Sequence, residues 1–217
     1  MSALVRSRVT RHRARRLIAS FVAIVVVVGC GSSSHRYVAN KSEKIYVKVP
    51  REWQDYTFDE TDPDRLEQIT SQATVVWRTA AAPYDDSGTP GQDRPLMYMA
   101  VYELSGELNQ QMSASLARVA GSPIGFDPVL PQDETQSDRV EVLAYAPLDF
   151  EDMSGTRAVF RSRDDAMSDW TNVYSLSTAY DSSAFRLYVL QIGCNVECFE
   201  SNETAISTVA NSWLVKP

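Results

Sequence analysis

The sequence predicts an α+β fold in which helices flank an antiparallel β-sheet. In the last third of this 217-residue chain, strand-like segments follow one another and are joined by short turns, which indicates antiparallel pairing. Helix-like segments are set among the strand runs rather than after every strand. The last segment changes to helical periodicity and predicts a C-terminal amphipathic helix. Its apolar face consists of Ile206, Val209, Ala210 and Trp213.

Residues 1–29 have the pattern of a secretory signal peptide. Six arginines and no acidic residue precede an apolar run from Leu17 to Gly29. As a helix, this run of about 13 residues would extend about 20 Å. Because the hydrocarbon core of a bilayer is roughly 30 Å thick, a cleaved signal is favoured over the alternative of a permanent transmembrane helix.

The apolar run ends in Val27-Val28-Gly29-Cys30, which resembles the lipobox of bacterial lipoproteins. In that family the cysteine, here Cys30, becomes the N-terminus and carries acyl chains, and two or more such chains anchor a protein stably. The arginines should stay in the cytoplasm. We therefore expect a lipid-anchored protein of the cell envelope on the outer face of the cytoplasmic membrane, with the membrane as partner through this lipid.

The polar, serine-rich residues after Cys30 are expected to form a flexible tether. We assign residues 30–43 to the lipidated cysteine and tether, and residues 44–217 to a single domain. Loss of the six N-terminal arginines changes the formal net charge from −7 to −13. An acidic domain does not suit nucleic acid, whose phosphates need a basic face, so no nucleic-acid partner is expected.

The first part of the domain is expected to begin with a strand at residues 44–50, where apolar and polar side chains alternate. Pro50 ends this strand shortly before Trp53. A short helix is expected over residues 63–69. Asp62 can cap it, and Pro63 suits its first position.

The middle of the domain is expected to contain two strands and one helix. The strands cover residues 74–79 and 96–104, with a loop rich in turn-forming residues between them. Asn109 can cap a helix that ends at Gly121. The prolines and acids of residues 121–138 predict a long loop.

The last third is expected to contain four strands and the terminal helix. The strand segments are 139–145, 155–161, 171–180 and 185–192. Residues 181–184 are short enough for a hairpin turn between the last two strands. Ser201 is the expected cap of the terminal helix.

The order of these segments resembles the PsbP-like fold. The features that carry the resemblance are a Val-Pro-x-x-Trp motif at 49–53, a helix after Ser-Gly-Glu-Leu-Asn at 105–109, and a Gly-x-x-Ala-x-Phe pattern at 155–160. The pattern is especially similar to the LpqN-type lipoproteins of actinobacteria, over residues 44–217. The resemblance implies a non-enzymatic accessory role, with lipid-transport machinery of the envelope as the class of partner.

Cys194 and Cys198 are expected to form a disulfide. With Cys30 lipidated, these are the two remaining cysteines, and the compartment is oxidising. The bridge would close a small loop before the terminal helix and stabilise the fold by about 2 kcal/mol in the chain-entropy model. A redox pair or a metal site is the alternative, but redox pairs have two intervening residues and zinc needs more ligands.

We predict no catalytic residue, no cofactor and no metal site, and hence a protein that is not an enzyme. His12 lies in the signal peptide and His35 in the tether, so a Ser-His-Asp device has no well-placed base. The acidic clusters 59–64, 149–152 and 164–165 are more typical of a solvated surface than of calcium or acid–base sites.

Three functions remain open. The first is a binding or accessory module for an envelope protein partner. The second is a carrier of a lipid or small hydrophobic ligand in a cleft between sheet and helices. The third is an envelope enzyme that uses carboxylates or a metal. An apolar cavity between the sheet and the helices would favour the second function, whereas convergent acids in a deep pocket would favour the third.

Overall fold

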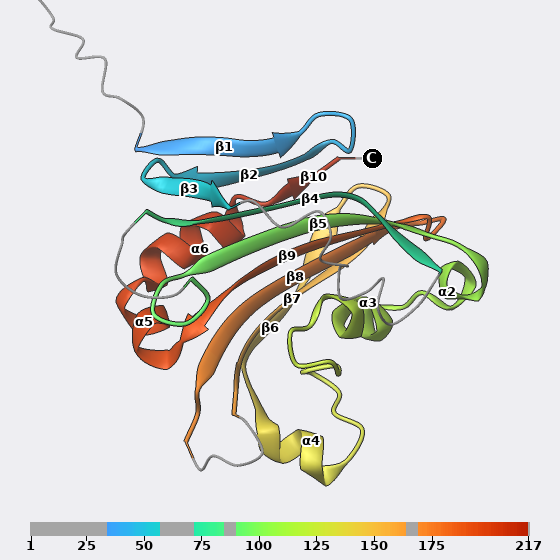
Figure 1. Cartoon of the computed structure of the whole chain (residues 1–217). Helices are drawn as coiled ribbons and strands as arrows, with labels where there is room; N and C mark the ends of the chain where they lie inside the picture. Colours follow the sequence, from blue (N-terminus) through green and yellow to red (C-terminus); the bar gives the residue numbers. More distant parts are fainter. Residues whose placement is uncertain (1–33, 57–71, 85–89, 164–168, 217) are drawn as a thin grey trace, which may run out of the picture. The chain divides into compact units, whose positions relative to one another are not determined.

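The computed structural model describes residues 34–56, 72–84, 90–163 and 169–216 (Figure 1). These residues belong to one compact unit, Ser33–Pro217. The predicted signal peptide, Cys30, the helix expected at 63–69 and the acidic clusters 59–64 and 164–165 lie outside the described residues. Within the described ranges, none of the helices has both the length and the apolar character that crossing a bilayer requires.

The main sheet has seven strands in the order β3-β4-β5-β9-β8-β7-β6, and every neighbouring pair is antiparallel. The strands are β3 (Trp53–Tyr56), β4 (Ala73–Pro83), β5 (Leu96–Leu104), β6 (Val140–Phe150), β7 (Met153–Ser162), β8 (Asn172–Asp181) and β9 (Arg186–Asn195). This sheet and the helices beside it confirm the predicted α+β class with antiparallel pairing.

A second, smaller sheet has the order β1-β2-β10. It consists of β1 (His35–Asn40), β2 (Ile45–Pro50) and β10 (Leu214–Val215). The assignment of residues 30–43 to a flexible tether is therefore wrong for its second half. Only Val38 of β1 is buried, so the strand has little periodic signal of its own. It forms because all six of its residues pair with β2.

Both faces of the main sheet are covered, as the alternation along β5 shows. Met97, Met99 and Val101 point into one core, which we call the first core. Tyr102 and Leu104 point into the second core on the opposite face. Successive side chains of a strand point to opposite faces, so burial on both faces of β5 means that other parts of the chain pack above and below the sheet.

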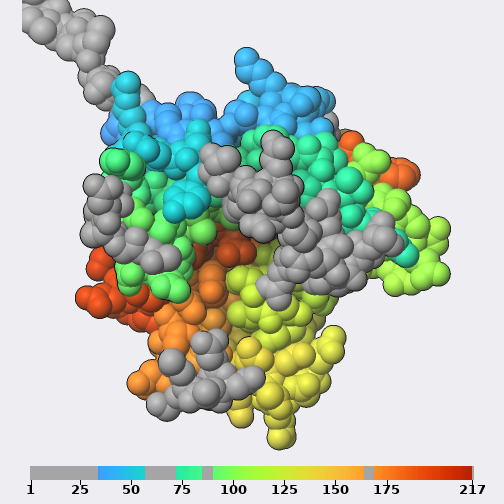
Figure 2. Space-filling view, in the orientation of Figure 1, coloured from blue at the N-terminus to red at the C-terminus, as the bar shows by residue number. Residues whose placement is uncertain are grey.

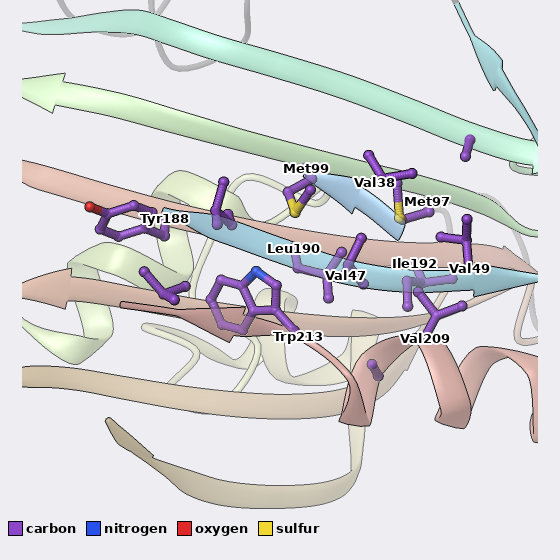
Figure 3. Packing of buried hydrophobic residues seen from close by; sticks show 14 of the residues in the cluster. Val38, Val47, Val49, Met97, Met99, Tyr188, Leu190, Ile192, Val209 and Trp213 are labelled. Carbon is purple, nitrogen blue, oxygen red and sulfur yellow. The ribbon is translucent and has the colours of Figure 1, made fainter. Parts of the chain in front are cut away.

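The first core lies between the main sheet, the small sheet and α6 (Glu203–Asn211). Val209 and Trp213 project from the end of the chain towards Val47 of β2 and Leu190 of β9 (Figure 3). Ile206, Val209 and Ala210 are buried, which confirms the predicted apolar face of the terminal helix, and Trp213 is also buried but lies just beyond the end of α6.

The terminal helical region begins earlier than expected and is broken. Helix α5 (Val196–Ser201) starts at Asn195, whose side chain accepts a hydrogen bond from the Cys198 N–H at 2.8 Å. Ser201 is the last residue of α5 rather than a cap, and α6 starts after Asn202. The prediction of Ser201 as the cap was wrong because Asn195, an equally favoured capping side chain, already starts the helical region six residues upstream.

The second core lies beneath α3 (Ala114–Gly121), which follows the short α2 (Gly106–Gln111). The single helix expected from Asn109 is thus two helices. Ser113 caps the second, because its hydroxyl accepts a hydrogen bond from the Leu116 N–H at 3.2 Å. Gly121 lies so close to the sheet that a Cβ atom there would stand 3.1 Å from side chains of β8 and β9.

The segment predicted as a loop over 121–138 contains one further helix, α4 (Glu134–Arg139). In Figure 2 its yellow residues form a projection at the lower end of this face. Asp133 caps the helix by accepting a hydrogen bond from the Gln136 N–H at 2.8 Å. Asp followed three residues later by Gln is a start signal for a helix, so this element could have been found from the sequence.

Candidate ligand-binding cleft

A cleft of about 440 Å³ lies between the β6–β7–β8 end of the main sheet and the pair α5–α6. Small-molecule sites commonly measure about 300–1,000 Å³, so this volume suits a small ligand. The apolar walls are formed by Leu143, Ala144, Val159, Val173, Val196, Phe199, Ile206 and Ala210. Polar groups from Arg157, Arg161, Ser175, Glu200, Glu203, Ser207 and Asn211 complete the lining.

Strand β7 supplies both a wall of the cleft and part of the second core. Ala158 and Phe160 are fully buried on the core side. Arg157, Val159 and Arg161 alternate with them and line the cleft. The period of two along a strand therefore places two arginines and a valine on one surface.

Strand β6 is the outer edge of the main sheet and contributes a bulge to the cleft. Its pairing with β7 shifts register between Val142 and Ala144. Leu143 and Ala144 both line the cleft, although they are consecutive residues. A bulge re-aims side chains in this way, and it leaves Leu143 half exposed at the mouth.

Arg157 joins the sheet to the end of α6. Its Nε donates to Ser177 Oγ at 2.8 Å and its Nη1 donates to Asn211 Oδ1 at 2.6 Å. Its Nη2 donates to the Ala210 carbonyl oxygen. Burial lowers the pKa of Arg157. A cation is favourable at the C-terminus of a helix, where carbonyl groups lack partners, so Arg157 also holds α6 in place.

Arg161, the other arginine of the cleft, has a carboxylate partner. Its Nε and Nη2 donate to Glu141 Oε2 at 2.9 and 2.6 Å. Its guanidinium also lies 4.7 Å from the centroid of the Trp170 ring, a cation–π contact. The charge of Arg161 is therefore balanced by neighbouring groups outside the cleft lining.

The predicted disulfide between Cys194 and Cys198 is present in the structure and supports one wall of the cleft. The two Cα atoms are 6.0 Å apart, and both residues are buried. The bridge joins the end of β9 to α5. It thereby holds Val196 and Phe199, which line the cleft, against the sheet.

The other residues weighed in the sequence lie apart from the cleft. His35 is in β1, and its Nδ1 lies 2.8 Å from Ser34 Oγ. The acids of the 149–152 cluster lie at the β6–β7 hairpin, where Asp152 adopts a left-handed conformation with φ of 57°. Over the ranges that the structure describes, no three His, Cys, Asp or Glu side chains come together as a metal site.

A buried ion pair fixes the opposite face of the sheet. Arg118 of α3 donates from Nε and Nη2 to the two oxygens of Asp127, both at 2.8 Å. Ser115 Oγ and the Val129 N–H donate to the same carboxylate at 2.6 and 2.9 Å. Burial alone would raise the pKa of Asp127, but these hydrogen bonds outweigh burial and lower it.

The residues that matter most in the cleft were not predicted from the sequence. Arg157 pairs with acceptors on β8 and on α6, and its partner Asn211 is 54 residues away. The alternation Arg157-Ala158-Val159-Phe160-Arg161 is visible in the sequence and places both arginines on one face. The sequence does not show which face of β7 lies beneath the helices, because that depends on where α5 and α6 pack.

Comparison with known protein families finds no match to this sequence, and no curated protein matches either. Among solved structures, the chain is similar to cyanobacterial PsbP (CyanoP) from Synechocystis sp. PCC 6803, with a TM-score of 0.51 and 13% identity over 86% of this chain and 95% of that chain. This likeness supports the PsbP-like fold that the sequence predicted, and at this identity it shows the fold alone.

Two further structures are more distant. LpqN, involved in cell envelope biogenesis of Mycobacterium tuberculosis, has a TM-score of 0.49 and 10% identity over 84% of this chain and 91% of that chain. The Ran-binding protein Mog1p of Saccharomyces cerevisiae has a TM-score of 0.44 and 10% identity over 83% of this chain and 95% of that chain. The LpqN type within the PsbP-like fold therefore stays a prediction.

Proposed function

We propose that this chain is a membrane-anchored extracytoplasmic lipoprotein that serves as a non-enzymatic accessory module for an envelope protein. The observation that carries the proposal is the position of Cys30, which ends an apolar run too short to span a bilayer. The folded domain starts with β1 at His35. Five residue steps reach at most about 18 Å, so an acylated Cys30 would hold the domain close to the membrane surface.

This proximity suits a partner that is itself embedded in the membrane. The LpqN-type resemblance implies lipid-transport machinery of the envelope as the partner class. The acidic body gives no affinity for anionic lipid by itself, so the lipid on Cys30 supplies the attachment.

Metabolic labelling with an alkyne-bearing fatty acid tests the anchor. We expect label on the wild-type protein in a bacterium with the lipoprotein pathway, and none on Cys30→Ser. Cys198→Ser is the matched control, because it removes a cysteine that would not be acylated. Equal labelling of wild type and Cys30→Ser would contradict the proposal.

Site-specific photo-crosslinking in cells tests the partner. A photoreactive residue in place of Tyr37, which is 71% exposed on β1, samples the part of the domain next to the tether. We expect reproducible adducts with one envelope protein when Cys30 is present, and their loss in Cys30→Ser. Repeated absence of an envelope protein in crosslinks from the anchored form would count against an accessory role.

A second candidate function is a carrier of a lipid or small hydrophobic ligand. The cleft of about 440 Å³ with mainly aliphatic and aromatic walls favours it. Native mass spectrometry of protein released from membranes would test this function, because a carrier retains ligand and gives a reproducible mass increment. Only the apo mass, at every extraction condition, would contradict it.

A further inference from the structure

Arg157 is a cation of the cleft whose described partners are all neutral. The guanidinium donates to a hydroxyl, an amide oxygen and a main-chain carbonyl. Among the carboxylates in the described part of the chain, none makes an ion pair with it, whereas Arg161 is paired with Glu141 at 2.6 Å. Burial already disfavours the charged form of Arg157. A cation kept in this position without a counter-charge is suited to an anionic ligand.

The hydrogen-bonding capacity of Arg157 is only partly used. A guanidinium has five N–H donors in a fixed fork. The three described bonds use the Nε proton and one proton on each Nη atom. One N–H on Nη1 and one on Nη2 remain, and each can donate a charge-assisted hydrogen bond to an anionic oxygen.

The apolar part of the lining fits an aliphatic chain. Val159 extends along β7 beside Arg157, and Leu143 lies at the β6 bulge. Phe199 and Ile206 form the opposite wall on α5 and α6. The volume of about 440 Å³ is at the lower end of the usual range for ligand sites, so it suits one chain rather than a lipid with two.

Glu200 and Glu203 set the orientation of such a ligand. Both line the cleft and both are exposed to solvent. An anionic head beside them would be repelled, although solvent weakens this effect. The head group is therefore favoured at Arg157, near the end of α6, rather than beside these two carboxylates.

We propose that the cleft binds a single-chain amphiphile with an anionic head, whose head accepts hydrogen bonds from Arg157 and whose chain lies along Val159, Phe199 and Ile206. This inference rests on the second candidate function, that the cleft holds a ligand, and adds the chemical class. A long-chain carboxylate is the simplest member of the class. The accessory role of the anchored protein does not depend on it.

Photoaffinity labelling of the full chain in lipid nanodiscs tests the inference. The two probes are a twelve-carbon carboxylate with a diazirine near the end of the chain, and the twelve-carbon alcohol with the same diazirine. Adducts are assigned to peptides by mass spectrometry. We expect the carboxylate to label cleft peptides from β6, β7, α5 or α6 at least about tenfold more strongly than the alcohol, because a charge-assisted hydrogen bond has this effect on affinity.

Variants separate the head-group contact from the fold. In Arg157→Gln the preference for the carboxylate should fall to about equal labelling with both probes. Arg161→Gln is the matched control, since it removes a second cleft arginine that is already paired, and it should retain the preference. Arg157→Lys keeps a cation and should retain part of it. Val159→Glu places an anion in the wall and should abolish carboxylate labelling.

The outcomes distinguish failure of the anionic-ligand inference from failure of the carrier function on which it rests. Equal labelling of the wild-type cleft by both probes would overturn the anionic class and leave the carrier function supported. Absence of cleft adducts with either probe would overturn both. If Arg157→Gln loses all labelling through a disturbed α6, folded Arg157→Lys decides. Preference for the carboxylate in that variant supports the inference, and its absence overturns it.

Discussion

Replacing the Asp127 carboxylate should destabilise the fold more than replacing an exposed charged side chain does. In Asp127→Asn, Arg118 keeps its charge but loses a partner that accepts two hydrogen bonds of 2.8 Å. The side chains of the pair are 4% and 3% exposed. Breaking a buried pair of this kind costs about 3–5 kcal/mol. Because 1 kcal/mol shifts Tm by about 2–4 °C in a domain of this size, we expect a decrease of about 6–20 °C.

Urea unfolding followed by circular dichroism measures this change as a free energy. Asp55→Asn is the control, because Asp55 makes an exposed ion pair with Arg36 at 2.7 Å and exposed pairs contribute about 0–1 kcal/mol. Replacing both buried partners, in Arg118→Met with Asp127→Leu, should be less destabilising than Asp127→Asn alone. A decrease below about 1 kcal/mol for Asp127→Asn would refute the reasoning.

The same pair predicts the pH dependence of stability. The pKa of Asp127 is lower in the folded protein than in the unfolded chain, where it is about 3.9. The carboxylate therefore stabilises the fold fully above about pH 4, and this contribution is lost as the pH falls towards the folded pKa. The difference in unfolding free energy between wild type and Asp127→Asn should shrink on acidification below pH 4. A difference that stays constant down to pH 2 would contradict a lowered pKa.

Three further changes test the packing. Phe160→Ala removes a fully buried ring from the second core and should lower the free energy of unfolding by about 3–5 kcal/mol in urea titrations. Gly121→Ala places a methyl group 3.1 Å from three side-chain carbons and should cost about 1–3 kcal/mol, seen as a lower Tm; an unchanged Tm would contradict this packing. Replacing Cys194 and Cys198 together by serine should cost about 2 kcal/mol, and reductant should then no longer affect stability.

The strands of the second half could be predicted because their periodicity matches their burial. Residues 155–161 alternate between core and cleft, and the predicted strand 171–180 agrees with β8 (Asn172–Asp181) to within one residue at each end. In contrast, β1 has one buried side chain, and its existence depends on pairing with β2. The helical break at Met112 was missed because one helix was expected from Asn109 to Gly121. Helix α5 was missed because the terminal helix was expected to begin only after Ser201.

The sequence predicted that a cleft could lie between the sheet and the helices, but it did not identify the residues that line the cleft. Its walls come from three strands, β6, β7 and β8, and from the two helices α5 and α6, which follow later in the sequence. The disulfide was predicted from the count of cysteines and the compartment, and it proves to support the wall that α5 forms. Among the described residues Arg157 has no carboxylate partner, and the Glu141 carboxylate of β6 pairs with Arg161.

The mass of the N-terminal peptide, measured on protein extracted from bacterial membranes, tests the central claim most directly. We predict a peptide that begins at Cys30 and carries two or three acyl chains. Detection of residues 1–29 still attached, or of an unmodified Cys30 thiol in the membrane fraction, would contradict the account of anchoring and of envelope function.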